Sequence, residues 1–154
     1  MAGQGDLALL NDPVAEKLLG STIPARLAYN WLDGSPRVVP IWFHWNGSEF
    51  VLGSPPRAPK LRALRHDPRV ALTIDANEFP HSVLLVRGTA RVEEYEGITP
   101  EYEACARRYF GEQMGEAWVT NMRKALASMG RIVIEPNWVS ILDFQKRFPS
   151  ALSA

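Results

Sequence analysis

Three side chains that can bind an anion, Ser54, Arg57 and Lys60, lie within seven residues of one another. Pro59, beside Lys60, can occupy the first turn of a helix whose leading amides have no partner within the helix. A phosphate group, with about two negative charges, is bound by this combination of hydroxyl, guanidinium, ammonium and free amides. The spacing therefore raises two hypotheses: a phosphate site, or a loop whose charges are only solvated.

The strand before this loop is expected at an edge of the sheet or beside a ligand. Its apolar residues are Val38, Val39, Pro40 and Ile41. Pro40 has no amide hydrogen, so it cannot be an ordinary central residue of a sheet. The backbone of such a strand can meet the polar edge of a planar ring while its side chains cover the ring. The aromatic residues that follow serve either a ligand or core and interface packing: Trp42, Phe43 and Trp45.

Turn signals and periodicity predict the elements that hold these residues. Helices are expected at residues 13–19, 59–65, 100–110 and 116–129. Strands are expected at residues 25–32, 37–45, 49–53, 70–74, 83–93, 132–134 and 138–144. The turns Asp33-Gly34 and Asn46-Gly47 predict that the first three strands form a meander. In the long strand, Gly88 predicts a bulge or bend of the kind that curls a sheet.

Six or seven strands with few helices indicate a mainly β fold with flanking helices, a small mixed barrel rather than a parallel βαβ sheet. A chain of 154 residues is expected to form one domain over residues 1–154. Its 17 basic and 17 acidic residues cancel, which disfavours nucleic acid and anionic membrane surfaces as partners. The amino-terminal sequence lacks a signal-peptide pattern, so a cytoplasmic protein is expected.

Histidines and cysteines do not indicate a metal site. Cys105 is the single cysteine, which excludes a disulfide within the chain and a cysteine-cluster metal site. The three histidines, His44, His66 and His81, lack short metal-ligand spacing. We therefore expect surface or interface histidines and no metal.

Three segments together carry a family resemblance. They are RVVPIWF at residues 37–43, GSPPRAPKLRALRHDPRVAL at residues 53–72 and VLLVRGTARVE at residues 83–93. In these segments the chain resembles the pyridoxamine 5'-phosphate oxidase-like group of flavin-binding split-barrel proteins. That group includes the actinobacterial flavin and deazaflavin oxidoreductases, and the resemblance extends from about residue 18 to residue 144.

The resemblance implies a homodimer of split β-barrels with two cofactor sites along the subunit interface. The strand from Arg37 to Trp42 would line an isoalloxazine ring, largely through its backbone. Gly53 and Ser54 would approach the ribityl chain and phosphate of FMN, and Arg57 and Lys60 would hold that phosphate. The deazaflavin F420 is the alternative cofactor, because its ring and phosphate occupy the same strand and loop in related proteins.

The chain departs from the true oxidase of vitamin B6 metabolism. Trp42 stands where that enzyme has a basic residue, and Ser82 stands near the place of a flavin-supporting glutamine. A recognisable carboxy-terminal substrate motif is also missing. The resemblance thus implies a flavin-dependent oxidoreductase that transfers hydride or electrons to a small or planar substrate, with an F420-dependent reductase or a flavin-binding sensor as alternatives. No catalytic residue can be named. Trp118 and Trp138 are expected either in packing or at the partner subunit's pocket.

Overall fold

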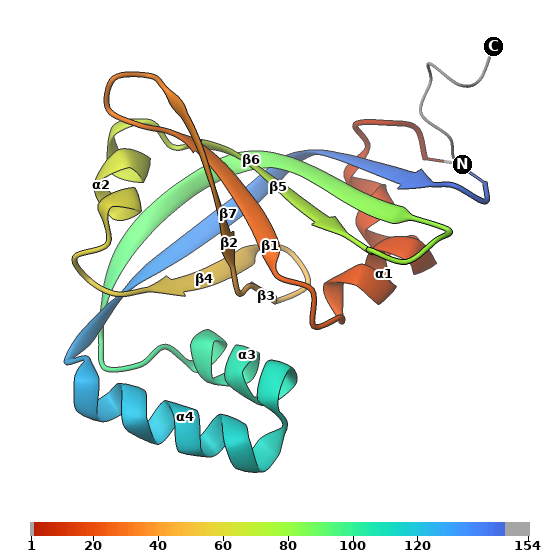
Figure 1. Cartoon of the computed structure of the whole chain (residues 1–154). Helices are drawn as coiled ribbons and strands as arrows, with labels where there is room; N and C mark the ends of the chain where they lie inside the picture. The colour runs from red at the N-terminus through yellow and green to blue at the C-terminus, as the bar shows by residue number, and fades with distance from the viewer. Residues whose placement is uncertain (1, 147–154) are drawn as a thin grey trace.

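The computed structural model describes residues 2–146. Seven strands form one curled sheet, and four α-helices lie against it (Figure 1). A 3₁₀ helix, η1 (Leu7–Asn11), comes first and is followed by α1 (Pro13–Leu19). The strands are β1 (Ala25–Asn30), β2 (Pro36–Ile41), β3 (His44–Trp45), β4 (Phe50–Ser54), β5 (Arg69–Asp75), β6 (Ser82–Glu96) and β7 (Ser128–Asp143). The remaining helices are α2 (Pro59–His66), α3 (Pro100–Phe110) and α4 (Glu112–Ala125).

The seven strands form one antiparallel sheet that closes on itself. Their order is β2-β1-β5-β6-β7-β4-β3, so β2 and β3 are the two edges. Only Trp42 and Phe43 separate these edge strands in the chain. Because consecutive Cα atoms are about 3.8 Å apart, Ile41 and His44 lie within about 11 Å of each other. The edges of the sheet therefore meet without pairing, which makes the barrel a split one and confirms the expected fold class.

The long pair of β6 and β7 carries the curvature. Their register shifts between Arg87 and Gly88, where Asn137 is the extra residue on β7. A Cβ atom on Gly88 would lie 2.4 Å from the backbone oxygen of Glu135, so a larger residue would push the two strands apart. The predicted bulge at Gly88 is confirmed, and the shift lets Pro136 stand inside β7.

Large apolar side chains fill the barrel. Along β5 buried residues alternate with half-buried or exposed ones, as expected for a strand with one face on the core. The largest side chains buried in this core include Leu27, Phe43, Phe50, Leu52, Ile74, Leu84, Ile132, Ile134 and Ile141. Phe43, in the two-residue link between the edge strands, is fully buried, and its ring centroid lies 5.9 Å from that of Phe50.

Two helices begin as the sequence indicates. The Asp12 carboxylate accepts a hydrogen bond from the amide of Val14 at 2.9 Å, and Pro13 occupies the first turn of α1. In α3 the Thr99 hydroxyl accepts a bond from the amide of Tyr102 at 3.2 Å. Helices α3 and α4 lie side by side across one end of the barrel, below β4 in Figure 1.

Some expected elements are wrong. Both expected hairpins are present, since β1 pairs with β2 and β3 pairs with β4. They do not form one meander, because β2 and β3 are opposite edges of the sheet and β4 pairs on its other side with β7. The expected strand at residues 37–45 is broken at Trp42 and Phe43, where the chain passes from one edge of the sheet to the other. The expected strands at residues 132–134 and 138–144 are a single strand, β7.

The fourth helix also differs from its expected bounds of residues 116–129. It begins at Glu112, before Gly115, and ends at Ala125. A Cβ atom on Gly115 would lie 2.8 Å from Cα of Arg107 and 2.9 Å from the carbonyl of Ala106. Gly115 is therefore a contact point between α3 and α4 rather than a helix break.

Candidate functional site

A cavity of about 260 Å³ lies where β2 and β4 end and α2 begins. It is lined by Ile41, Trp42, Gly53, Ser54, Pro55, Lys60, Tyr102 and Trp118. We call it the Lys60 cavity. Strand β4 delivers Gly53 and Ser54 to one side of it, and the first turn of α2 delivers Lys60.

Ser54 is a buried hydroxyl without a partner. The residue is only 1% exposed, and within residues 2–146 its Oγ atom has no hydrogen-bond partner. Its backbone is paired with Gly130 of β7 at the end of β4. Leaving a buried hydroxyl unsatisfied costs about 1–3 kcal/mol. A ligand atom that bonds to Ser54 would remove this cost.

Lys60 brings the positive charge to the cavity. It is half-buried, and burial lowers the pKa of its ammonium group below the ordinary 10.5. Within residues 2–146 no carboxylate offsets this effect. The helix that carries it begins at Ala58, whose side chain cannot cap the first amides. The Lys60 ammonium has no ion-pair partner within residues 2–146, and it lies near helix amides that no side chain caps. Both features favour the binding of an anion in this cavity.

An aromatic wall closes another side of the cavity. The ring of Trp42 stacks on Tyr109 with centroids 5.0 Å apart, and it contacts Tyr102 at 5.6 Å and Trp118 at 6.4 Å. The indole nitrogen of Trp118 donates a hydrogen bond of 2.9 Å to the hydroxyl of Tyr102. Trp42 is thereby fixed against α3 and α4, and these two helices form part of the site.

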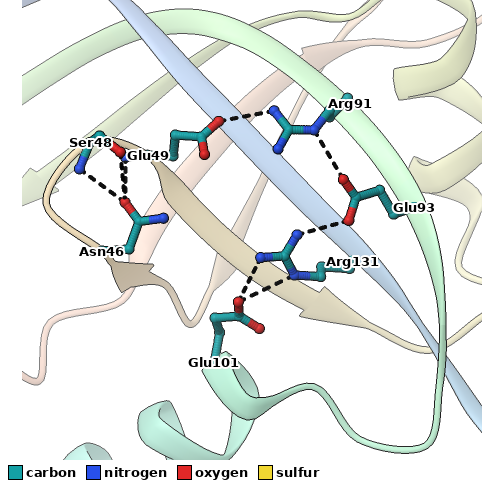
Figure 2. Close-up of polar contacts among 7 residues, drawn as sticks. All are labelled: Asn46, Ser48, Glu49, Arg91, Glu93, Glu101 and Arg131. Atoms are coloured by element: carbon teal, nitrogen blue, oxygen red, sulfur yellow. Dashed lines mark hydrogen bonds and ion pairs between the residues drawn. The ribbon is translucent and has the colours of Figure 1, made fainter.

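A chain of ion pairs holds α3 in place beside the cavity (Figure 2). Glu101 of α3 accepts a bond of 2.6 Å from Arg131 of β7, and Arg131 also binds Glu93 of β6 at 2.8 Å. Arg91 extends this chain, because its guanidinium donates a hydrogen bond of 3.0 Å to Glu93 and another of 2.9 Å to Glu49. Because Tyr102 follows Glu101 directly, this chain sets the position of the aromatic wall.

Gly53 is required by the same packing. A Cβ atom on it would lie 2.9 Å from the ring of Tyr102 and 2.9 Å from the Cε methyl of Met129. Helix α3 thus rests directly on the end of β4. Gly53 serves the site by allowing this close contact.

The structure brings five of the ten predicted site residues together. Those that line the Lys60 cavity are Ile41, Trp42, Gly53, Ser54 and Lys60. The other residues of β2 do not line it: Arg37, Val38, Val39 and Pro40. Arg57 lines a separate hollow together with Trp31 and Arg62.

Sequence reasoning did not assign Tyr102 or Pro55 to the site, and it left Trp118 between packing and the partner subunit. In the structure all three line the cavity of their own chain. The only sequence signal for Tyr102 is its place with Tyr109 on one face of a helix. Nothing in the sequence shows that this face meets Trp42. Trp138 is on β7, beneath the guanidinium of Arg87, whose carbon lies 4.0 Å from the ring centroid.

The residues of the Lys60 cavity fit the phosphate end of a nucleotide cofactor. Ser54 supplies an unused hydroxyl and Lys60 an unpaired ammonium. The cavity volume of about 260 Å³ is smaller than that of pockets that hold drug-sized ligands, which is about 300–1,000 Å³. The cavity of one chain therefore suits a phosphate group and its immediate neighbours rather than a whole tricyclic cofactor.

Within residues 2–146, no three side chains among His, Cys, Asp and Glu lie close enough together to bind a metal ion. No helix in this part of the chain is both long and apolar enough to cross a membrane.

Comparisons with known proteins agree with this architecture. The family model described as pyridoxamine 5'-phosphate oxidase matches residues 13–143. A search of curated proteins gave no match.

Solved structures of similar fold are numerous, and three illustrate their range. An F420 reductase matches with a TM-score of 0.61 and 24% identity over 81% of this chain and 94% of its own. A conserved hypothetical protein from Mycobacterium tuberculosis matches with a TM-score of 0.66 and 20% identity over 84% and 82%. HutZ, a heme storage protein from Vibrio cholerae, matches with a TM-score of 0.60 and 15% identity over 86% and 93%. At these identities the likeness establishes the fold.

Proposed function

Because the chain belongs to the pyridoxamine 5'-phosphate oxidase family, we propose that it is a flavin-dependent oxidoreductase. It binds FMN and transfers hydride or electrons to a small or planar substrate. The observation that carries this proposal is the pairing of an unsatisfied buried hydroxyl, on Ser54, with an unpaired half-buried ammonium, on Lys60, in one cavity. Such a pair is suited to a phosphate group.

Ser54 and Lys60 hold the cofactor phosphate in this proposal. The Ser54 hydroxyl donates a hydrogen bond to a phosphate oxygen, and the Lys60 ammonium supplies a charge-assisted bond. Free amides in the first turn of α2 add to the attraction. Arg57 stays a predicted phosphate ligand from the family resemblance, although it does not line the Lys60 cavity and lines a different hollow.

The strand from Arg37 to Trp42 borders the ring of the cofactor. As an edge strand, β2 pairs only with β1, so the backbone groups on its outer side have no partner in the sheet. These groups are available for the polar edge of a planar ring. Val38 is 68% exposed, which leaves an apolar side chain for the ring or for a second subunit.

FMN, when bound, supplies the hydride chemistry at its N5 position. The protein binds and orients the cofactor, and it needs little acid or base machinery for that purpose. Trp42, Tyr102 and Trp118 exclude water from the side of the cavity that they cover. No catalytic residue is assigned. The subunit is proposed to act as a homodimer, since the cavity of one chain is too small for the whole cofactor.

F420 is the alternative cofactor. One protein of the same fold is an F420 reductase. The phosphate group of F420 would bind to Ser54 and Lys60 in the same way as that of FMN. A third possibility is a protein that binds or senses a flavin without turnover of a specific substrate. Oxidation of pyridoxamine 5'-phosphate is not proposed, because Trp42 packs among aromatic rings where the vitamin B6 enzyme has a basic residue.

A spectroscopic titration tests the proposal. Purified protein is mixed with FMN or F420, its visible absorption is recorded, and the complex is reduced anaerobically with NADH, NADPH or reduced F420. Binding followed by fast reduction, and by reoxidation with a substrate, supports an oxidoreductase. Tight binding without turnover leaves a flavin-binding protein. A protein that takes up neither cofactor contradicts the proposal.

A further inference from the structure

Helix α3 is joined to the edge of the sheet by a second contact besides the ion pair of Glu101. The guanidinium of Arg108 donates a hydrogen bond to the backbone oxygen of Phe43, and its central carbon lies 4.7 Å from the centroid of the Phe43 ring. Phe43 belongs to the two-residue link between β2 and β3. Arg108 therefore connects α3 to the place where the two edges of the sheet meet.

Two polar atoms beside this contact are buried without a partner. Within residues 2–146, the Nε atom of Arg108 and the Oε2 atom of Glu101 have no hydrogen-bond partner. Arg108 also forms no ion pair in this part of the chain. A buried charge without a partner of opposite sign is costly. The contact is therefore sensitive to any further positive charge that appears next to it.

His44 can gain such a charge. It follows Phe43 directly and begins β3, and α3 packs against this strand. Its side chain is half-buried. Burial lowers the pKa of His44 below its ordinary 6.5, the positive charge of Arg108 lowers it further, and the carboxylate of Glu101 acts in the opposite direction. The imidazole is therefore neutral at neutral pH and becomes positive only in acid.

Within residues 2–146, the other groups around His44 do not offset its protonation. Its partner on β4 is Val51, which carries no charge. Cys105 of α3 has a neutral thiol, because burial raises its pKa to about 11. The carboxylate of Glu101 is already bonded to Arg131 at 2.6 Å. A proton on His44 thus adds a second positive charge beside the buried guanidinium.

We propose that His44 is a pH-sensitive switch that controls how tightly α3 packs against β3. When His44 is neutral, α3 stays in place. When His44 is protonated, the cost of a half-buried charge and the repulsion from Arg108 loosen α3 from the edge of the sheet. Because Tyr102 of α3 lines the Lys60 cavity, this movement opens the aromatic wall. The switch needs no bound cofactor, and it does not depend on the function proposed above.

The direction of the pKa shift gives the pH range of the switch. The pKa of His44 is lower in the folded chain than in the unfolded chain, so the neutral side chain favours the packed form. This stabilisation is complete above about pH 6.5 and is lost as the pH falls below that value. Helix α3 should therefore open more often at about pH 5.5 than at about pH 7.5.

The thiol of Cys105 reports the opening of α3. Cys105 is the single cysteine of the chain and is 2% exposed, so a thiol reagent reaches it only when α3 moves. A dithiodipyridine reagent, which reacts in mild acid, is added at each pH to the folded protein and to the chain unfolded in urea. The ratio of the two labelling rates corrects for the chemistry of the thiol. We expect this ratio to rise about threefold or more between about pH 7.5 and about pH 5.5.

Matched variants assign the effect to one histidine. In His44→Gln the side chain stays neutral, so the rise in the labelling ratio should disappear. The control variants are His66→Gln, at the exposed end of α2, and His81→Gln, just before β6. Both should keep the rise of the parent. No rise in the parent, the same rise in His44→Gln, or equal losses in all three variants would overturn the inference.

Hydrogen exchange of the parent keeps the switch testable if His44→Gln does not fold. The protection of the α3 amides, corrected for intrinsic exchange rates, is followed against pH together with the nuclear magnetic resonance signals of the three histidine rings. The loss of protection should have the same midpoint as the ring of His44. Protection that stays constant, or that follows the ring of His66 or His81, would overturn the inference.

Discussion

At the scale of single residues, the candidate site depends on two polar groups that the rest of the chain leaves unused. The hydroxyl of Ser54 is buried without a partner, and Lys60 loses hydration without gaining a carboxylate. Both arrangements raise the free energy of the protein without a ligand. This is the physical reason to regard them as a binding site rather than as packing.

Replacing Lys60 with alanine should weaken cofactor binding. The change removes a charge-assisted bond to the phosphate, which is typically worth about 1.5–3 kcal/mol, or about 10- to 150-fold in affinity. Stability should change little, since no ion pair is broken. Fluorescence titration with FMN and with F420 measures the effect, and Lys124→Ala, at the exposed end of α4, is the control. Equal affinity in the parent and Lys60→Ala would show that Lys60 does not bind the phosphate.

Cofactor affinity should also fall at alkaline pH. Burial lowers the pKa of Lys60 from its ordinary 10.5, and a bound phosphate needs the protonated ammonium. The affinity for the cofactor is therefore highest below the lowered pKa of Lys60, and it decreases as the pH rises through that pKa. In Lys60→Arg the guanidinium stays charged, so the alkaline decrease should move upward. Dissociation constants between about pH 7 and pH 10 test this, and the same profile in parent and variant would contradict it.

Cys105 should make stability sensitive to alkaline pH. Burial raises the pKa of its thiol from 9.0 to about 11, and the residue is 2% exposed. The fold therefore keeps the thiol neutral, while the unfolded chain releases its proton above pH 9. This contribution is present below pH 9 and is lost between pH 9 and pH 11, by about 2 kcal/mol. Urea unfolding at several pH values should show that loss in the parent but not in Cys105→Ala.

At the scale of elements, the helical pair α3 and α4 decides the shape of the site. It covers one end of the barrel, places Tyr102 and Trp118 in the cavity wall and holds Trp42. Its anchor is the bond between Glu101 and Arg131, two side chains that are 18% and 21% exposed. The position of a whole wall thus depends on one half-buried ion pair.

Glu101→Gln should therefore affect both stability and cofactor binding. Of the two carboxylate partners that Arg131 has within residues 2–146, the variant leaves Glu93, and the loss costs about 1–3 kcal/mol of unfolding free energy. Because Tyr102 moves with its neighbour, FMN affinity should fall as well. Urea denaturation and FMN titration measure the two effects, with the exposed Glu94→Gln as control. A variant as stable as the parent would show that the ion pair does not anchor α3.

Helix and strand positions were mostly predictable from local signals, and the errors have tertiary causes. The expected helix starts at residues 13 and 100 are confirmed, and in the structure Asp12 and Thr99 cap these two helices. The expected fourth helix begins too late, at residue 116, whereas Gly115 lies inside α4, where α3 packs too closely for a side chain. The two expected final strands are one, because the bulge opposite Gly88 accommodates Pro136 inside β7.

At the scale of the whole molecule, the sheet closes because two residues connect its opposite edges. The free edge of β2 carries Val38, which is 68% exposed. Together with the small volume of the Lys60 cavity, this supports the proposal that a second subunit covers the strand. A cofactor site would then be completed by two chains.

A measurement of mass in solution tests the dimer. The parent is expected to elute as a dimer in size-exclusion chromatography with light scattering. Val38→Lys should shift the equilibrium toward the monomer, because it places a charge in an apolar contact. Phe79→Lys, at another exposed apolar residue, 77% exposed on the loop between β5 and β6, is the control and should remain dimeric. A monomeric parent would contradict the homodimer.

The sequence by itself determined the chemistry of the candidate site and the type of fold. Ser54 and Lys60 could be identified because local spacing and helix capping act over a few residues, and the strand pattern indicated a barrel for the same reason. Only the tertiary structure decided that β4 pairs with β7, that Tyr102 and Trp118 join the cavity, and that Arg57 faces a different hollow from Lys60. These facts depend on contacts between segments that are distant in the sequence. Such contacts are set by the packing of side chains in the closed sheet, and local sequence patterns do not predict that packing.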